Sequence, residues 1–470
     1  MAGNLTTILP RLPSSATTFP YVLPLPPART ILGYLLPLIP IHLVLVKIFR
    51  NRFSRQLQAK HPYSSNPGPG QKPLSEMPLS AAHDVIKLLS SKDFPYFFNL
   101  ALQFALIRTY AVPSISTLLV KTTQLDSQSR NTVGKRYADT GVIISEFYHN
   151  APGSTRSAEA FARLNYLHGH YIRQSKISND DMLYTLSMFV LQPPEWIDKY
   201  EWRPFTELEI CGIGLFHRFV GEAMEISFDP LDDFPPPPLP GHAADKSRTW
   251  RTDGLAFFHS LDAWSKVYET RVMLPNEPSH SITMKTLHLL TSTLPSSLGK
   301  VVYQTAISMM DTRMRAACLL PSPPPSYRRN IDRFLAIRAF VIRHFCYPRR
   351  ALWGWWVPEE ERGMSTETPD PITGRRYFAT YEALPHYVKP TFFNRWISPA
   401  AWASWSLGVP VPGDPEMEGK GWLMTETGPK AFVGKGNAEF AVTKQRLEGR
   451  VRVQEPVSDA PRGCPMFVKV

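Results

Sequence analysis

Apolar residues recur every three to four positions through most of this chain, which is the spacing of one face of an α-helix. Alternating patterns typical of strands are scarce. The sequence therefore predicts an all-α protein with a large multi-helix body. The predicted helices span residues 81–89, 96–112, 129–147, 157–172, 179–191, 206–224, 252–272, 281–294, 296–319 and 327–345.

The composition narrows the class of protein. A length of 470 residues with 43% hydrophobic content is enough for a core that needs no disulfides or structural metals. The four cysteines are sparse and include no C-x-x-C pair, so we expect a reducing compartment and no zinc site. The net charge of +12 comes without a nucleic-acid-binding signature. We interpret it as attraction to anionic membrane lipid, with no nucleic acid as partner.

An apolar segment near the N-terminus predicts a membrane anchor. Residues 31–49 approach the length of a bilayer core, although Pro37, Pro40 and His42 weaken the span. Basic residues are more frequent after this segment than before it, so the positive-inside rule places the main body in the cytosol. The alternative is a cleaved targeting presequence. We therefore predict an anchor at 29–49 and a lumenal segment at 1–28, in which Asn4 begins a glycosylation sequon.

The rest of the chain divides by composition. Residues 50–78 are rich in Pro, Gly and Ser and are predicted to be a flexible linker. The helical pattern then places a catalytic body at 79–407. Within it, the tryptophans between 352 and 405 are expected to cover the core rather than rest on a membrane. Residues 408–470 are rich in Gly, Pro and charge, and predict a loosely packed tail.

His168 is the main candidate for a cofactor ligand. It continues the apolar stripe of Phe161, Leu164 and Tyr171 on one predicted helix. The neighbouring His170 lies about 200° away around the same helix, so both cannot bind one metal ion. A buried imidazole can ligate haem iron, but a lone histidine on an apolar face is more often an ordinary core residue.

A second helix carries three polar residues on one face. Arg136, Asp139 and Thr140 fall at i, i+3 and i+4. A guanidinium can pair with a haem propionate or with bound oxygen, and a hydroxyl can hydrogen-bond to an oxygen ligand. The alternatives are a solvated Arg136–Asp139 ion pair, and a Thr140 hydroxyl bonded to a carbonyl one turn earlier.

A rival metal site has the spacing of di-iron bundles. Glu146-x-x-His149 matches the i, i+3 pair that these proteins use. The second copy, Glu277-x-x-His280, contains Pro278 and is expected to lie in a loop. Histidine boxes, H-E-x-x-H, G-x-S-x-G, a P-loop and G-x-G-x-x-G are absent. The open alternatives are thus a non-haem iron oxygenase and a non-catalytic, membrane-tethered interaction protein.

Several motifs resemble one family. RYADT, RLNYLHGHY, KISNDDMLYTLSMFVLQPPEWIDKYEWRPFTELE and GEAMEI, between residues 135 and 229, are similar to the fungal ER-bound oxygenases of the mycophenolic acid pathway type. More distantly, the chain resembles the rubber oxygenases (latex clearing proteins). The fungal relatives have one N-terminal anchor and a cytosolic body, in agreement with the charge bias described above.

The resemblance implies a fold, a cofactor and a reaction. The rubber oxygenases have a globin-like helical core and bind haem b through a histidine that corresponds to His168. Their distal Arg-x-x-Lys-Thr pattern corresponds to Arg136, Asp139 and Thr140, with Asp139 in place of a lysine that closes the iron site. The resemblance thus implies an ER-membrane oxygenase of fungal secondary metabolism that uses molecular oxygen to cleave a carbon–carbon double bond in a lipophilic isoprenoid or meroterpenoid. Arg136, Asp139 and Thr140 would be its catalytic residues.

Overall fold

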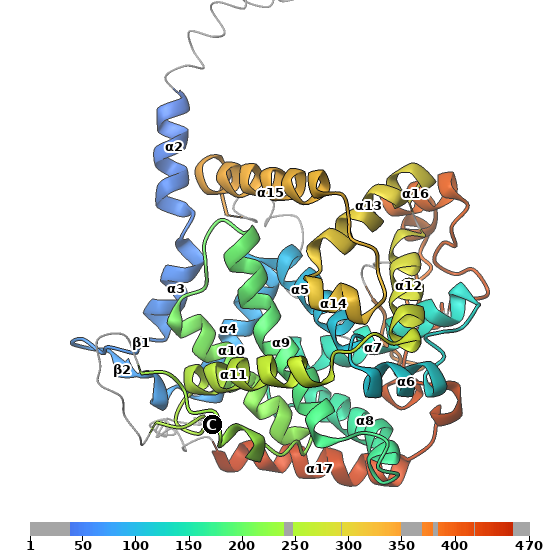
Figure 1. Ribbon diagram of the computed structural model, residues 1–470, viewed down its shortest axis with the longest axis horizontal. Helices are drawn as coiled ribbons and strands as arrows, with labels where there is room; N and C mark the ends of the chain where they lie inside the picture. The colour runs from blue at the N-terminus through green and yellow to red at the C-terminus, as the bar shows by residue number, and fades with distance from the viewer. Residues whose placement is uncertain are drawn as a thin grey trace, which may run out of the picture.

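The computed structural model describes residues 38–238, 248–292, 294–348, 369–378, 384–417 and 419–454 (Figure 1). These residues are mostly helical, which confirms the all-α prediction. The two strands are β1 (Tyr63–Ser64) and β2 (Lys72–Pro73), which pair in parallel. The helices are α2 (Leu38–Phe49), α3 (Arg52–Lys60), α4 (Leu79–Leu88), α5 (Pro95–Thr109), α6 (Pro113–Thr122), α7 (Arg130–His149), α8 (Thr155–Ile172), α9 (Asn179–Tyr200), α10 (Glu207–Ala223), α11 (Gly254–Val272), α12 (Glu277–Thr291), α13 (Ser296–Met309), α14 (Thr312–Ala317), α15 (Pro325–Phe345), α16 (Pro399–Leu407) and α17 (Asn437–Gln454).

Local sequence signals explain where several helices begin. The Ser178 hydroxyl caps α9 by accepting a hydrogen bond from the backbone N–H of Asp181 at 3.0 Å. Thr206 and Glu209 form a reciprocal capping box at the start of α10. Pro278 lies in the first turn of α12, where a missing N–H costs no hydrogen bond. The loop predicted around Pro278 is therefore wrong, because proline is compatible with a helix start.

Two sets of helices form the centre of the body. α5 packs along α9, and α10 packs between α4 and α11. The crossing of α10 and α11 is very close: a Cβ atom added at Gly214 would lie 1.9 Å from the carbonyl oxygen of Gly254. Only glycine allows these two backbones to approach so closely. The short G-x-G pattern at 212–214 is thus explained by helix packing.

The predicted anchor lies only partly within the described residues. Residues 1–37 fall outside them, and with them Asn4, the lumenal segment 1–28 and the first part of the anchor. The remaining part forms α2, which projects from the body at the top of Figure 1. In the described part of the chain, no helix has both the length and the apolar content to cross a bilayer.

The stretch predicted to be a flexible linker is structured. Residues 52–60 form α3, and the two short strands follow it. Leu57, Leu74 and Met77 are buried in the main hydrophobic core. The prediction failed because it used the average composition of the segment, which is rich in proline and glycine. An average does not show the three apolar residues that pack into the core.

The predicted loose tail is also wrong for the part that the structure describes. After Gly408 the chain returns to the body, and α17 packs along α8 at the lower edge of Figure 1. Trp422, Met424 and Leu447 are buried. Residues 455–470 lie outside the described residues. Glycines and prolines here form turns between packed positions and do not prevent packing.

Three of the tryptophans do not cover the core. Trp396, Trp402 and Trp405 are 49%, 68% and 49% exposed. Residues 351–368, which contain three more tryptophans, lie outside the described part of the chain. The expectation that this region covers the core is wrong for the described tryptophans, since sequence periodicity cannot tell which face of a short helix meets a neighbour.

Candidate functional site

Helices α7 and α8 carry the four residues that the sequence predicts for the site. Residues 150–154 join the two helices and turn the chain back. Phe147 of α7 stacks on Phe161 of α8, with ring centroids 5.1 Å apart and planes 18° apart. Thr140 and His168 each lie seven residues, about two helical turns, from that contact. Thr140 and His168 therefore lie on the helix faces that carry Phe147 and Phe161.

His168 has the environment of a neutral ligand. Its Nδ1 atom is buried without a hydrogen-bond partner among the described residues. Burial lowers the pKa of His168 to about 4, so the ring is uncharged at neutral pH. His170 lies elsewhere, with its ring 5.2 Å from that of Phe432 and hydrogen-bonded to Gln174. The prediction that the two histidines occupy different faces agrees with these contacts.

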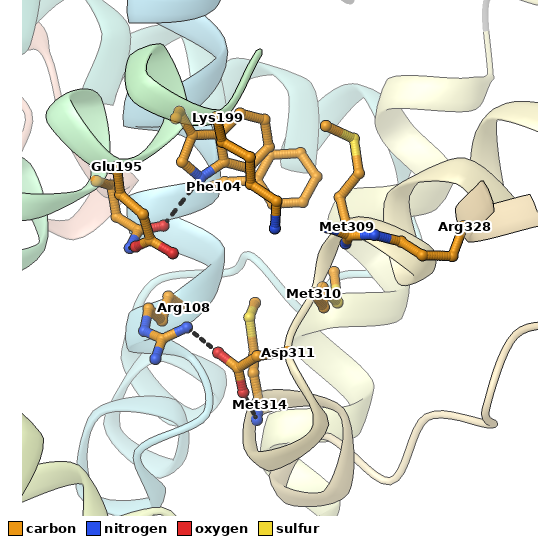
Figure 2. A pocket seen from close by; sticks show the side chains of 11 residues that line it. Phe104, Arg108, Glu195, Lys199, Met309, Met310, Asp311, Met314 and Arg328 are labelled. Atoms are coloured by element: carbon orange, nitrogen blue, oxygen red, sulfur yellow. Dashed lines mark hydrogen bonds and ion pairs between the residues drawn. The ribbon is translucent and has the colours of Figure 1, made fainter. Parts of the chain in front are cut away.

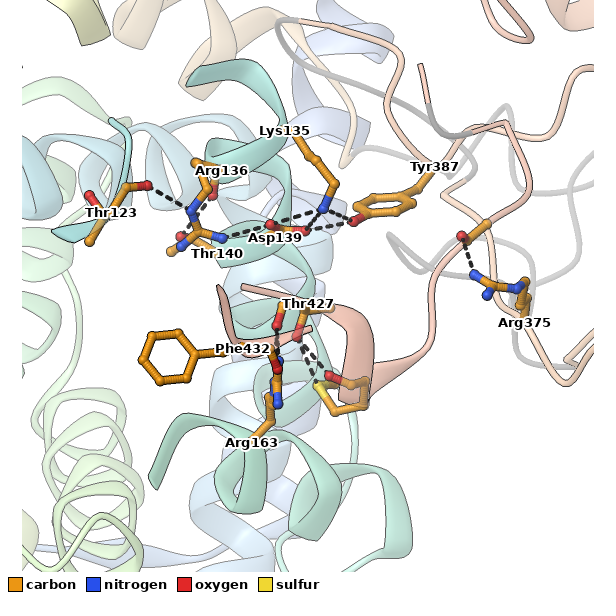
Figure 3. Close-up of polar contacts among 12 residues, drawn as sticks. Thr123, Lys135, Arg136, Asp139, Thr140, Arg163, Arg375, Tyr387, Thr427 and Phe432 are labelled. Carbon is orange, nitrogen blue, oxygen red and sulfur yellow. Dashed lines mark hydrogen bonds and ion pairs between the residues drawn. The ribbon is translucent and has the colours of Figure 1, made fainter. Parts of the chain in front are cut away.

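Arg136 and Asp139 form a buried ion pair, not a solvated one. Arg136 Nη1 donates to Asp139 Oδ2 at 2.6 Å, and Arg136 Nε donates to the carbonyl of Thr123 at 3.0 Å (Figure 3). Asp139 is completely buried and Arg136 is 8% exposed. The Thr140 hydroxyl donates to the Arg136 carbonyl at 3.1 Å, as the alternative interpretation of this residue stated. These bonds fix the orientation of the guanidinium.

The Asp139 carboxylate has two further donors. Lys135 Nζ lies 3.2 Å from Oδ1, and the hydroxyl of Tyr387 donates to the same oxygen at 2.6 Å. Figure 3 shows the three donors converging on this one side chain. A carboxylate with both oxygens occupied is poorly placed to accept a proton from a substrate. Asp139 therefore acts as a fixed counter-charge that positions Arg136 and Lys135.

Arg163 is a buried cation that the sequence patterns did not single out. It is only 1% exposed and ranks among the largest fully buried side chains. Its guanidinium donates to the carbonyl of Thr427 at 2.6 and 2.9 Å, and to those of Phe432 at 2.9 Å and Lys435 at 3.2 Å. Burial lowers the pKa of Arg163, and its closest acceptors carry no charge. Lys135 and Arg136 thus share the carboxylate of Asp139, whereas Arg163 donates to backbone carbonyls.

A cavity of about 210 Å³ opens beside these cations. Arg136, Lys135 and Lys430 line it together with His386. Within the described residues, neither ring nitrogen of His386 has a hydrogen-bond partner of good geometry, although the backbone of Asn131 is near. Burial, and then the charge of Lys135, lowers the pKa of His386 to about 4. The volume is below the ~300–1,000 Å³ of typical ligand pockets, so the cavity suits one end of a ligand.

The rival metal site is occupied by an arginine. Arg156 makes two hydrogen bonds to the carboxylate of Glu146, at 2.6 and 2.7 Å. His149 Nδ1 is paired with the Ser145 carbonyl at 3.0 Å. No group of three or more His, Cys, Asp or Glu side chains within the described ranges is arranged to hold a metal ion. The Glu146–His149 spacing is therefore explained by an ion pair and a helix-end contact.

A second, smaller cavity of about 90 Å³ lies apart from α7 and α8 (Figure 2). Arg108 is one of the residues that line it. Its guanidinium donates to both oxygens of Glu269 at 2.8 Å and also contacts Asp311. The Tyr184 hydroxyl donates to the same Glu269. This network joins α5, α9 and α11 to the start of α14. Its groups are paired with one another, which is typical of a structural network.

Three fungal proteins are similar to this chain, at 32–35% identity. The ER-bound oxygenase mpaB′ of Penicillium brevicompactum is 33% identical over 408 residues, covering 86% of this chain and 89% of that protein. The chain belongs to the mpaB oxygenase family. The ER-bound oxygenase mpaB of the same species is 32% identical and covers 79% of this chain and 81% of that protein. The mpaB of Penicillium roqueforti strain FM164 is 35% identical over 59% of this chain and 86% of that protein. No family model matches the chain.

Membership in the mpaB family confirms the resemblance inferred from the sequence motifs and makes the protein an oxygenase. The sequence patterns found Arg136, Asp139, Thr140 and His168, and the structure brings all four onto one helix pair. They missed Arg163, and also Tyr387 and His386. Lys135 has a sequence signal, since it stands four residues before Asp139. Tyr387 and His386 have none, because they reach α7 from about 250 residues away.

Proposed function

We propose that this oxygenase uses haem b, with His168 as the iron ligand. The observation that carries the proposal is the buried, unpaired ring nitrogen of His168. A buried polar atom without a partner costs free energy, and an iron bond would satisfy it. The lowered pKa keeps the imidazole in the neutral form that metals bind. These residues therefore fit the cofactor that the family resemblance implies.

The charge around the cavity supports the same cofactor. Lys135, Arg136 and Lys430 line the cavity together with one acidic residue, Glu416. Asp139 pairs with two of these cations, so three positive charges face two negative ones and the region keeps an excess positive charge. A haem b has two propionates, and arginine is well suited to bind a carboxylate. With Nε and Nη1 held by Thr123 and Asp139, Nη2 of Arg136 has no acceptor among the described residues and is the atom that would bind a propionate.

Thr140 has a narrower role than its residue type allows. Its proton is engaged by the Arg136 carbonyl, so the hydroxyl oxygen is free only to accept a hydrogen bond. From the face of α7 that it shares with Arg136, it could accept a hydrogen bond from a water molecule in the site. Bound haem supplies the redox chemistry that activates molecular oxygen. The protein residues supply the ligand, the fixed charge and the orientation.

We further propose that the substrate is a lipophilic isoprenoid or meroterpenoid whose carbon–carbon double bond is cleaved. The kinship with fungal oxygenases supports this class of substrate. An anchor at 29–49 would hold the cytosolic body on the ER membrane, where such molecules concentrate. The described half of that segment, α2, exposes apolar side chains such as Leu38, Ile41 and Val44, as a helix in lipid does.

A visible absorption spectrum of the purified full-length protein, with iron analysis, tests the cofactor. Haem predicts a Soret band and one iron per chain bound through histidine. Iron and activity without a Soret band would instead support the non-haem alternative at Glu146 and His149. A protein without iron or oxygenase activity would support the interaction protein and overturn the proposal.

A further inference from the structure

Helix α15 has a second apolar face that points away from the protein. Leu335 is buried, whereas Phe334, Ile337 and Val341 are exposed by 68%, 64% and 41%. These three lie at i, i+3 and i+7, so they form one stripe along the helix. Phe345 extends the stripe to the end of α15. A soluble surface rarely exposes so many large apolar side chains in a row, and such patches mark interaction sites.

Basic residues flank this stripe. α15 contains five arginines and a single acidic residue, Asp332. Arg329, Arg333 and Arg343 are exposed. Asp332 is already paired with Arg328 at 2.9 Å. A helix with an exposed phenylalanine-containing face and flanking arginines has the composition of helices that lie in the interface of membranes with anionic lipid.

The stripe is continuous with the projecting helix α2. His42 of α2 is hydrogen-bonded to the carbonyl of Phe345 at 2.8 Å, and its ring meets the ring of Tyr347 edge-on at 5.1 Å. Apart from the face with His42 and the buried Val46, α2 exposes apolar side chains on its remaining sides. A helix of this kind is suited to lipid, not to one protein groove. Because α15 contacts α2, a membrane that surrounds α2 would also meet the outer face of α15.

Aromatic residues add to this end of the molecule. Figure 1 shows α13, α15 and α16 along the same upper edge. Trp396 and Trp405 stack with centroids 5.2 Å apart, and both remain half exposed. The indole N–H of Trp402 donates to the carbonyl of Trp396 at 2.9 Å, while its ring is open to solvent. Tryptophans that expose their rings in this way are typical of the membrane–water interface.

We propose that α15 lies in the headgroup region of a membrane that contains anionic lipid, with Phe334, Ile337 and Val341 inserted between the acyl chains. This contact would hold the catalytic body against the bilayer and fix its orientation beside α2. This membrane contact of α15 does not depend on the haem chemistry proposed above. A lipophilic substrate would then enter from the membrane side.

The test places a fluorescent label on the full-length chain. Cys346, which is exposed, and Cys464, which lies outside the described residues, are both replaced by serine, which leaves the buried Cys211 and Cys318. A single cysteine is then introduced by Ile337→Cys and labelled with an environment-sensitive dye. The matched control is Val442→Cys on α17, an equally exposed apolar position at the opposite edge of Figure 1.

The labelled proteins are reconstituted into vesicles of phosphatidylcholine with phosphatidylserine. We expect a blue shift of the Ile337 label and its quenching by lipids brominated on the acyl chain, while the Val442 label remains open to aqueous iodide. Adding Phe334→Asp and Val341→Asp should abolish the shift, with circular dichroism confirming an unchanged helical content. Removing phosphatidylserine should weaken it.

Two results would overturn the proposal. One is equal iodide access to both labels in vesicles, since the anchor alone would bring both near the membrane without inserting either. The other is a blue shift at Ile337 that depends on protein concentration and not on lipid, which would show contact with a second copy of the chain. Either result leaves the haem spectrum unaffected, so failure here is distinguishable from failure of the proposed function.

Discussion

The Tyr387 hydroxyl donates a 2.6 Å hydrogen bond to the buried carboxylate of Asp139, across 248 residues of chain. Tyr387 belongs to the irregular segment after residue 383, and Asp139 lies in the middle of α7. The bond therefore joins the C-terminal part of the chain to the helix that carries Arg136. It also satisfies a charge that water cannot reach.

Removing this hydroxyl tests its contribution to stability. Tyr387→Phe should lower the free energy of unfolding by about 1.5–3 kcal/mol, because a hydrogen bond to a buried charged group is lost. Urea unfolding followed by circular dichroism measures the change. Tyr96→Phe is the control, since Tyr96 is 60% exposed and should change stability little. Equal stability of both variants would show that Lys135 and Arg136 alone satisfy Asp139.

His168→Ala should abolish haem loading while the helical content stays unchanged. The physical reason is that His168 would be the side chain on α8 that binds the iron. His170→Ala is the matched control on the same helix and should load normally. Absorbance at the Soret band relative to protein concentration gives the occupancy. Full occupancy in His168→Ala would remove this residue from the site.

Arg163 should hold the C-terminal segment in place. Arg163→Met removes the donor to the carbonyls of Thr427, Phe432 and Lys435, and leaves the buried carbonyl of Thr427 without that partner. We expect a loss of about 2–4 kcal/mol in unfolding free energy and faster proteolysis between residues 425 and 436. Arg173→Met, at the residue that follows α8, should have little effect, because its ion pair with Glu439 of α17 is exposed to solvent. Unchanged proteolysis would mean that α17 holds the segment without Arg163.

Stability should fall as the pH decreases from about 6.5 to about 4. Burial lowers the pKa of His217 from 6.5 to about 4 in the folded protein, so the unfolded chain takes up a proton first. The stabilisation is therefore complete above pH 6.5 and is lost as the pH falls toward 4. His217→Gln should give a shallower dependence of unfolding free energy on pH. An equally steep dependence would assign the effect to other histidines.

The helices themselves were largely predictable. Apolar spacing located α4, α5, α7, α8, α10 and α11 to within a few residues, because each buries one continuous face. α9 was expected to end at Leu191, yet it continues through Pro193 and Pro194 to Tyr200. Proline usually interrupts a helix by removing a hydrogen bond, but the buried contacts of Trp196 and Ile197 keep this one continuous.

The candidate site was predictable only in part, and for a clear reason. Arg136, Asp139, Thr140 and His168 lie on helices, where the period of 3.6 residues fixes which side chains share a face. Tyr387 and His386 lie in an irregular segment, which has no period to read. Arg163 gave no signal of its own, since arginine is mostly exposed in proteins, and only the folding of residues 427–435 over α8 buries it.

By itself, the sequence determined the helical class, the helix starts at Ser178 and Thr206, and the kinship with fungal oxygenases. These depend on local spacing and on motifs. Only the tertiary structure decided that Arg163 is buried, that Asp139 is fully paired and that α15 presents an apolar face to the outside. Burial is set by which distant segment covers a side chain, and no local pattern carries that information.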